Sequence, residues 1–494
     1  MKRIILCISI FAGMMILNHT WGKPPIETPK DTPVLGEIDS YLIETLYKAE
    51  DSDAGLESIV NNERFKQLIE QHDLALFGGP MLGGLTHNSA TVWLRTPGAA
   101  KVKLHVQPKV NLSLIRIRTS DTITTKAEND FTAVLEVKGL SPASLYEYNI
   151  LVDGKPVYPK DLPEFRTYPA KKQKAVFKVG FGGGARYVPE KEKMWDVIAS
   201  HDPDAFLFLG DNVYIDKPLR RNAQRVHYYR RQLRPEFRRL TEKTSIYAIW
   251  DDHDFGGDDS TGGPHRFKPD WKLPVWRVFK ENWNNPYYGG GDELPGCWFD
   301  FSIGDVDFFM LDGRYYRDGG EGAKKSHAPF KKGKENKTML GSAQKKWLIE
   351  NLKTSEATFK IIASPVQWTE HADKGGGDSW WGVRDERKEI FDLIEDNEIG
   401  GVILLSADRH RADVFKMERD VGYDLYEFST SKLTNNHTHG TKEQAVFSYN
   451  KGNYFGLLMF DFTKPDPEVT FECITMENES VYKLTLNRSQ LEPR

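Results

Sequence analysis

Short apolar runs that end in polar or glycine-rich loops are the feature that most constrains the fold of this sequence. Runs of this length without polar alternation are typical of strands buried on both faces of a sheet. They lie at residues 176–181, 205–209, 246–250, 306–311, 359–363 and 402–405. Helical periodicity occurs between several of them, at residues 190–200, 342–351 and 384–396. This alternation predicts an α/β fold in which helices cover the sheets.

The pattern differs in the first third of the chain, which at 494 residues is long enough for more than one domain. Residues 78–168 alternate at period two, as half-buried strands do. The corner before Tyr146 and Tyr148 resembles that of immunoglobulin- and fibronectin-III-like sandwiches, where a Tyr bonds to the backbone. We predict a signal peptide at 1–22, a helical segment at 23–77, a small all-β sandwich at 78–168, and an α/β domain with C-terminal strands at 175–494.

The first 22 residues have the pattern of an export signal. Met1, Lys2 and Arg3 form a basic start, residues 4–17 are apolar, and Gly22 offers a small residue for cleavage. Cleavage would release a secreted or periplasmic protein, and an uncleaved membrane anchor is the alternative. No later segment is apolar enough to span a bilayer, so we expect no stable membrane insertion after cleavage.

Composition narrows the class of protein further. Hydrophobic residues make up 39% of the chain, which is enough for a large core and excludes a mostly disordered chain. The formal charge of -4 gives no reason to expect nucleic-acid binding. The mature chain keeps two cysteines, Cys297 and Cys473. One disulfide between them is compatible with export, but two thiols are not a disulfide framework, so we expect free buried cysteines.

Acidic residues and histidines collect where the apolar runs end. Asp211 follows one run, Asp252 and His253 follow a second, and Asp408 and His410 follow a third. In α/β folds, ligands gather beyond the carboxyl ends of the strands. Oxygen and nitrogen donors without thiolate suit Fe, Mn, Ca, Mg or Zn. A carboxylate shared by two ions holds them roughly 3.5–4 Å apart, as in metal-assisted hydrolysis of phosphate esters.

Each of these residues also has a plainer interpretation. Asp211 alone would be an ordinary turn carboxylate, and His253 alone a hydrogen-bonded structural histidine. Asp258 and Asp259 are typical of a solvated loop. The coincidence of Asp at several strand ends, with His at two of them, favours a functional site over independent accidents.

The motifs at these strand ends resemble those of the PhoD-like alkaline phosphatases, which belong to the calcineurin-like metallophosphoesterases. The motifs are Phe181-Gly-Gly-Gly-Ala-Arg186, Gly210-Asp211-Asn-Val-Tyr214, Trp250-Asp-Asp-His-Asp254 and Ser406-Ala-Asp-Arg-His410. The resemblance covers roughly residues 78 to 464. It implies a four-layer α/β/β/α sandwich behind the small all-β domain, secretion, iron and calcium ions, and hydrolysis of phosphate mono- or diesters by metal-activated water.

The resemblance also assigns the metal ligands. Asp211 would bridge two ions, and Tyr214 would be a phenolate ligand of a ferric ion. Asp252 would bind the second ion. Asp408 and His410 would supply one ligand to each ion.

Three further residues are the predicted catalytic groups. By the same resemblance, His253 would stabilise or protonate the leaving oxygen, and Asp254 would orient the ring of His253. Arg186 directly follows a predicted strand and would hold a phosphate oxygen.

One departure from the family pattern bears on the metal. PhoD-like enzymes carry a Ser-Cys pair after the first catalytic strand, and the Cys binds iron; Gly183 and Gly184 stand there in this chain. Without that thiolate, water or a hard divalent ion would complete the site, so Mn, Zn or Mg compete with iron. Gln367 stands where a further His ligand is expected.

The predicted substrate-binding residues are Gly183, Gly184, Arg314, Arg409 and Trp381. The glycines would let backbone N–H groups approach an anion. Trp380 and Trp381 fit either a lid against a sugar or a packed core. The expected substrate is a small phosphate ester, with sugar- and lipid-linked esters included. The alternative is a catalytically degenerate protein that binds phosphate or anionic glycans on the same fold.

Overall fold

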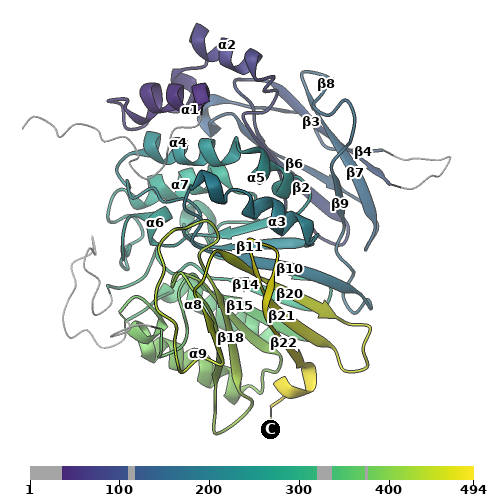
Figure 1. The fold of residues 1–494 in the computed structure, drawn as a ribbon, viewed down its shortest axis with the longest axis vertical. Helices are drawn as coiled ribbons and strands as arrows, with labels where there is room; N and C mark the ends of the chain where they lie inside the picture. Colours follow the sequence, from purple (N-terminus) through teal and green to yellow (C-terminus); the bar gives the residue numbers. More distant parts are fainter. Residues whose placement is uncertain (1–35, 110–116, 320–336, 373–376, 494) are drawn as a thin grey trace, which may run out of the picture.

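Two large β-sheets form the centre of the molecule, and smaller sheets and helices lie at its N-terminal side (Figure 1). The computed structural model describes residues 36–109, 117–319, 337–372 and 377–493. The predicted signal peptide at 1–22 lies outside these residues. Within the described ranges, no helix is both long and apolar enough to cross a membrane.

The first large sheet has six strands in the order β12-β11-β10-β20-β21-β22. Its strands are β10 (Val176–Gly182), β11 (Ala205–Leu209), β12 (Ser245–Ile249), β20 (Tyr454–Asp461), β21 (Glu468–Thr475) and β22 (Ser480–Asn487). β10, β11 and β12 are parallel, whereas β20, β21 and β22 add antiparallel strands to one edge. The first three apolar runs are therefore confirmed as neighbouring parallel strands.

The second large sheet has seven strands in the order β13-β14-β15-β16-β18-β17-β19. Its strands are β13 (Phe299–Ile303), β14 (Val306–Met310), β15 (Phe359–Ala363), β16 (Val402–Ser406), β17 (Ala412–Met417), β18 (Leu425–Thr430) and β19 (Phe447–Tyr449). β14, β15, β16 and β18 run parallel to one another. The other three apolar runs are thus confirmed as β14, β15 and β16.

Within the described residues, seven α-helices follow or connect these strands. They are α3 (Met194–Ser200), α4 (Arg221–Gln232), α5 (Pro235–Thr241), α6 (Asp252–Phe255), α7 (Lys272–Asn282), α8 (Gly341–Thr354) and α9 (Arg384–Asp396). The helices predicted at 342–351 and 384–396 are confirmed as α8 and α9. The helix predicted at 190–200 begins later, because a single 3-10 turn at Pro189–Lys191 precedes α3.

Aromatic side chains hold the two large sheets face to face. Phe428 of β18 stacks on Phe471 of β21 with ring centroids 4.5 Å apart. Phe308 of β14 contacts Phe460 of β20 at 6.2 Å, while the next residue, Phe309, contacts Trp347 of α8 on the opposite face. Successive residues of a strand point to opposite faces. Both faces of β14 are therefore buried, which explains why its sequence lacks polar alternation.

The first sheet is covered by helices in the same way. Trp195 of α3 and Phe237 of α5 both contact Phe208 of β11, at centroid distances of 5.7 and 6.1 Å. Each of these aromatic side chains is at most 2% exposed. Burial of a large apolar side chain contributes about 2–3 kcal/mol, so this cluster is a substantial part of the core.

The region before β10 contains two small antiparallel sheets. They are formed by β1 (Gly78–Gly83), β2 (Ser89–Arg95) and β6 (Thr132–Lys138), and by β3 (Lys101–Pro108), β4 (Arg118–Thr119), β5 (Ile123–Thr124), β7 (Leu145–Val152), β8 (Lys155–Pro156) and β9 (Glu164–Arg166). Tyr146 closes the corner before β7, because its hydroxyl accepts a hydrogen bond from Ser141 N at 2.8 Å. The bond expected of a tyrosine corner is therefore present.

Both cysteines of the described chain are free and buried, as the sequence analysis predicts. Burial raises the pKa of the Cys297 thiol and that of the Cys473 thiol well above their usual range. Neither is poised to react as a thiolate.

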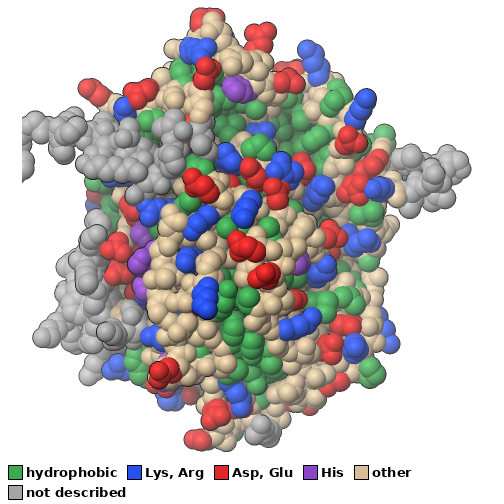
Figure 2. Space-filling view, in the orientation of Figure 1, with side chains coloured by type: hydrophobic (Ala, Val, Ile, Leu, Met, Phe, Trp, Pro, Cys, Tyr) green, Lys and Arg blue, Asp and Glu red, His purple; other side chains and the backbone are tan. Residues whose placement is uncertain are grey.

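The surface mixes charges of both signs. On the face shown in Figure 2, Lys and Arg side chains alternate with Asp and Glu side chains, with no broad area of one sign. Exposed ion pairs occur among the described residues, for example Arg239 with Asp196 at 2.7 Å and Lys388 with Asp392 at 2.6 Å. Exposed pairs of this kind add little to stability.

The N-terminal helices α1 (Gly36–Leu42) and α2 (Glu63–Gln71) form a second apolar cluster with α4. In this cluster, the Tyr47 ring meets the His227 ring edge-on at 5.9 Å, and Asn222 Nδ2 donates to Leu46 O at 2.8 Å. His227 is 7% exposed. Burial and the nearby Arg230 lower the pKa of His227 to about 3.

This buried histidine predicts a loss of stability in acid. The folded chain keeps His227 neutral, whereas an unfolded chain protonates it below about pH 6.5. Stability is therefore lost as pH falls from about 6.5 toward 3, by about 2 kcal/mol between pH 7 and pH 5. We expect the difference in unfolding free energy between the wild type and His227→Gln to change by that amount over this interval, measured by urea denaturation. A difference that stays constant with pH would contradict the prediction.

Candidate active site

The carboxyl ends of the parallel strands of both large sheets meet at one place. Gly183, just after β10, forms an isolated parallel bridge with Ser431, just after β18. Thr430 Oγ1 also donates to Phe181 O at 3.2 Å. The loop after β10 therefore lies against the loop after β18, at the strand ends where α/β folds place their ligands.

Several residues at these strand ends adopt the left-handed backbone region. Gly210 has φ +101°, and a Cβ there would lie 2.5 Å from the Asp251 Cβ, so only glycine fits. Asp211, Asp408 and His410 have φ of +53°, +63° and +46°. Non-glycine residues rarely adopt this conformation, and strain of this kind clusters at functional sites.

The predicted metal ligands Asp211 and Asp252 and the predicted catalytic His253, all after strands of the first sheet, lie together. Asp211, Asp252 and His253 each offer one ligand atom, and these atoms lie within 4.8 Å of one another. Tyr214 Oη donates to Asp211 Oδ2 at 2.7 Å and lies 3.0 Å from His410 Nε2. The tyrosine thereby connects the carboxylate group of the first sheet to the histidine of the second.

The buried carboxylates fit a cationic ligand. Within the described part of the chain, Asp211 Oδ1 has no hydrogen-bond partner although it is buried. Burial and the neighbouring carboxylates, opposed in part by His253, raise the pKa of Asp211 well above its usual range. Burial also raises the pKa of Asp408 to about 7, with Asp378 and Asp252 adding to the effect and Arg409 opposing it. Bound cations would offset the free-energy cost of burying these carboxylates, because without cations the neighbouring negative charges repel one another.

His253 is held by an aspartate other than the predicted one. Its Nδ1 lies 2.7 Å from Asp216 Oδ1, and its ring lies 4.2 Å from the Tyr214 ring. Burial alone would lower the pKa of His253, but the carboxylates of Asp252, Asp211 and Asp216 raise it well above its usual range.

Asp254 does not orient this ring, so that prediction is wrong. Its carboxylate accepts hydrogen bonds from the backbone N–H groups of Asn212, Val213 and Asp251, at 3.0–3.1 Å. Asp251 and Asp254 also form the capping box of α6. Asp254 therefore fixes the loop after β11 to the start of α6 and acts on the backbone, not on the imidazole.

Arg314 is not available to a substrate, which corrects a second prediction. Its guanidinium is fully buried, contacts Asp251 through Nε, and pairs with both oxygens of Asp378 at 2.9 and 3.0 Å. Arg317 also pairs with Asp378, at 2.6 Å. Although burial opposes it, Arg314 and Arg317 hold the pKa of Asp378 well below its usual range. Arg314 is therefore part of an internal ion network behind the site.

Gly183 and Gly184 do not present free N–H groups to an anion, which corrects a third prediction. Gly183 N donates to Thr430 O at 3.2 Å, and Gly184 N donates to Gly210 O at 3.3 Å. A Cβ on Gly184 would lie 2.8 Å from Lys432 N, at a φ of +68°. The loop after β18 fills the space that a side chain at position 184 would need.

The same loop supplies a side chain that the sequence analysis missed. Asn435 Nδ2 donates to Tyr214 Oη at 2.6 Å and lies 3.3 Å from His410 Nε2. The amide thus sits beside the tyrosine and histidine that are expected to bind metal. Asn435 follows a strand end, but no local pattern in the sequence distinguishes it from a turn residue.

The remaining predicted residues have varied environments. The Arg186 guanidinium lies 5.9 Å from the Tyr214 ring centroid, beside the site. Arg409 is 8% exposed and pairs with Asp408 at 2.9 Å. Trp381 is half-buried, and the Arg387 guanidinium lies 5.9 Å from its ring. Trp380 is fully buried and stacks on Trp368 at 4.0 Å, so it belongs to the core.

Two acidic residues outside the predicted set of site residues also contact the site. Asp216 lies in the loop that carries Asp211 and Tyr214, which is a usable signal, but a turn aspartate has the same appearance. Asp259 was expected in a solvated loop, yet its N–H donates to Asp252 Oδ2 at 2.6 Å. Asp252, Asp258 and Asp259 also offer ligand atoms within 4.8 Å of one another.

Similarity to known proteins agrees with this geometry. Residues 180–463 match the family model of the PhoD-like phosphatases, which is more than half of the chain. The chain belongs to the PhoD-like phosphatase family. The resemblance found in the sequence motifs is thereby confirmed. Residues 73–170 match a separate model, a domain of unknown function named DUF7800.

Relatives and solved structures agree with this membership. Over 141 residues, the chain is 27% identical to alkaline phosphatase D of Bacillus subtilis (strain 168); this stretch is 27% of the chain and 23% of that protein. A solved structure of PhoD matches with a TM-score of 0.69 and 16% identity, over 85% of this chain and 91% of that one. A purple acid phosphatase from yellow lupin (Lupinus luteus) seeds matches with a TM-score of 0.59 and 12% identity, over 83% and 75%. These likenesses confirm a mixed α/β fold of the phosphoesterase type.

The buried position of Arg314 predicts that replacing it destabilises this PhoD-like phosphatase more than replacing an arginine outside its ion network. Arg314→Met leaves Asp251 buried without its partner and Asp378 with Arg317 alone, so we expect the free energy of unfolding to fall by about 3–5 kcal/mol. Arg239→Met breaks only the exposed pair with Asp196 and is the matched control, with unfolding free energy changed by less than about 1 kcal/mol. Urea denaturation of both variants measures the difference. Equal stability of the two variants would show that Arg314 is not a structural ion.

Proposed function

We propose that this protein is a metal-dependent phosphoesterase that hydrolyses phosphate mono- or diesters. The observation that carries the proposal is the convergence of Asp211, Tyr214, Asp252, His253 and His410 from both large sheets, in a chain of the PhoD-like phosphatase family. Carboxylate, phenolate and imidazole groups at one strand edge suit metal-assisted hydrolysis.

Asp211, Tyr214, Asp252, Asp408 and His410 would hold the metal ions. Calcium and iron are the ions that the family resemblance implies, with Mn, Zn and Mg as competitors. When bound, such ions supply a Lewis acid for the phosphoryl oxygens and lower the pKa of water. The space closed off at Gly184 favours a centre without a thiolate ligand, and the Asn435 amide donates a hydrogen bond to the Tyr214 hydroxyl beside it.

His253 would act on the leaving oxygen. Because Asp216 engages Nδ1 of this ring, Nε2 is the atom that can donate a proton to an alcohol as it departs. Asp216 is then a positioning residue, which fixes the tautomer and the direction of the ring. Arg186, Arg409 and Trp381 remain the proposed substrate contacts, with Arg186 the best placed beside Tyr214.

We also propose the finer features that the sequence analysis predicts. The aromatic contacts between and outside the two large sheets support a four-layer α/β/β/α sandwich. The β-strands at residues 78–168 support a separate N-terminal all-β domain ahead of a catalytic domain at 175–494. The basic and apolar pattern of residues 1–22 supports export to the periplasm or the medium.

Hydrolysis of two chromogenic esters tests the function. We expect purified protein to hydrolyse p-nitrophenyl phosphate, bis(p-nitrophenyl) phosphate or both, to lose activity with a chelator, and to regain it with one of Ca, Mn, Zn, Mg or Fe. Asp211→Asn should lower kcat by about 100-fold or more, because it removes a charged ligand at the centre of the site. The ratio of the two rates gives the preference between monoester and diester.

Two results would contradict the proposal. Activity that is indifferent to chelator and to Asp211→Asn would exclude the metal-dependent mechanism. No turnover with any metal, in protein whose circular dichroism and melting temperature are normal, would favour the alternative of a phosphate- or glycan-binding protein.

The contact between Asp216 and His253 predicts a dependence on the leaving group. We expect Asp216→Ala to lower kcat by about 10- to 100-fold for an alkyl phosphate, whose alkoxide needs a proton, and much less for p-nitrophenyl phosphate. Asp216→Asn keeps an acceptor for His253 Nδ1 and should recover part of the rate. Exposed Asp270→Ala is the matched control. An equal loss with both esters would show that Asp216 does not act through the proton donor.

A further inference from the structure

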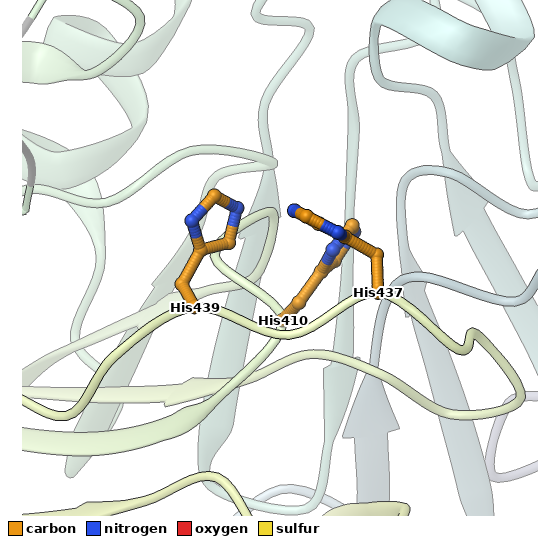
Figure 3. A group of neighbouring side chains, drawn as sticks. All are labelled: His410, His437 and His439. Atoms are coloured by element: carbon orange, nitrogen blue, oxygen red, sulfur yellow. The ribbon is translucent and has the colours of Figure 1, made fainter.

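Three histidine side chains gather beside the site and outside the carboxylate group. His410, His437 and His439 each offer one ring nitrogen, and these atoms lie within 4.8 Å of one another. Their ring centroids are 4.7–5.6 Å apart. Figure 3 shows that His437 and His439 come from one loop and that all three rings converge on the same space. Two of these residues have no role in the proposed hydrolysis.

The two nitrogens of His410 face different surroundings. Nε2 lies 3.0 Å from Tyr214 Oη and 3.3 Å from Asn435 Nδ2, on the side of the carboxylate group. Nδ1 is buried and has no hydrogen-bond partner among the residues that the structure describes. The side chain as a whole is 7% exposed. A buried ring nitrogen without a partner is costly, and a metal ion is one ligand that removes the cost.

The loop that carries the other two histidines is fixed to the loop of His410. Thr438 Oγ1 donates to His410 O at 3.2 Å, and Asn450 Nδ2 donates to His439 O at 2.9 Å. His437 N donates to Asn435 Oδ1 at 2.9 Å. Residues on both sides of His437 and His439 are thus tied to the site, so the three rings are held near one another before any ion binds.

The type of ligand narrows the choice of ion. Imidazole nitrogen suits Zn, Cu, Ni and Fe, whereas Ca and Mg prefer oxygen. In tetrahedral sites Zn–N distances are about 2.0–2.1 Å, so ligand nitrogens are roughly 3.4 Å apart. Nitrogens within 4.8 Å of one another reach this arrangement with rotations of the His437 and His439 side chains. His437 is exposed, which leaves a fourth position open to water or to a substrate oxygen.

We propose that His410 Nδ1, His437 and His439 bind a divalent transition-metal ion, with Zn²⁺ as the best fit, at a site that shares only His410 with the carboxylate centre. When both nitrogens of His410 bind metal, the ring releases its proton and bridges the two sites as an imidazolate. The site is built from the loops after β16 and β18 and opens to the surface. An ion there would add positive charge beside the carboxylate group and would attract phosphate esters. It would also hold the His410 ring in place for its contact with Tyr214.

Metal content of purified full-length protein tests this site without an activity assay. The variants are His437→Ala/His439→Ala, Asp211→Asn, and the triple variant that combines them; exposed His87→Ala/His265→Ala is the matched control. Each apoprotein is dialysed against Zn²⁺, and bound metal is measured by mass spectrometry. We expect the His437→Ala/His439→Ala variant to bind one ion fewer per chain than the wild type and the control. Asp211→Asn should keep this ion, and the triple variant should lose it.

Cobalt gives a second readout of the same site. In the Asp211→Asn background, Co²⁺ should show the visible absorption of a site with nitrogen ligands, and this absorption should disappear in the triple variant. Zn²⁺ binding of equal number and affinity in wild type and His437→Ala/His439→Ala would overturn the proposal. Because the readout is made where the carboxylate centre is disabled, failure of the proposed hydrolysis would leave this result unchanged.

Discussion

The buried ion network around Arg314 is the interaction on which the arrangement of the site depends. Arg314 contacts Asp251 and Asp378, which lie on loops far apart in the sequence, and so joins the loop after β12 to the loop before α9. Asp251 in turn caps α6, whose first residues are Asp252 and His253. Without a buried cation behind them, adjacent carboxylates in a protein interior would repel one another or be protonated. The network sets both the position and the charge of the residues in front of it.

Backbone strain and crowding are concentrated on the same edge. Left-handed Asp211, Asp408 and His410 lie directly after strands of two different sheets, and Gly210 and Gly184 have no room for a side chain. Such positions cost stability, which the aromatic contacts between the sheets and with the covering helices offset. The sheets are therefore the rigid support, and the loops at their ends carry the unfavourable geometry that chemistry needs.

The sequence predicts the parts of this structure that follow from local pattern. Apolar runs identified six strands of the two large sheets, and helical periodicity placed α9 at its observed ends. Both signals depend only on residues close together in the sequence, because a strand buried on both faces is continuously apolar and a helix repeats every 3.6 residues. Asp211 and His410 could be grouped in advance because parallel strands end at a common edge. Contacts that depend on long-range packing could not be predicted from the sequence. Asp216 and Asn435 look like ordinary turn residues, and an arginine after a strand, as Arg314 is, has the same appearance whether it meets a substrate or a buried aspartate.

The lack of space for a side chain at Gly184 keeps a thiol out of the site and so affects how the protein responds to oxidants. The family places a thiolate there, whereas this chain has no sulfur at that position and keeps Cys297 and Cys473 fully buried with raised pKa values. Thiolates are the side chains that peroxide and alkylating reagents attack first, and they require exposure to react. A phosphatase site with carboxylate, phenol, amide and imidazole groups and no thiol is therefore suited to oxidising surroundings, because it offers peroxide no thiolate to attack.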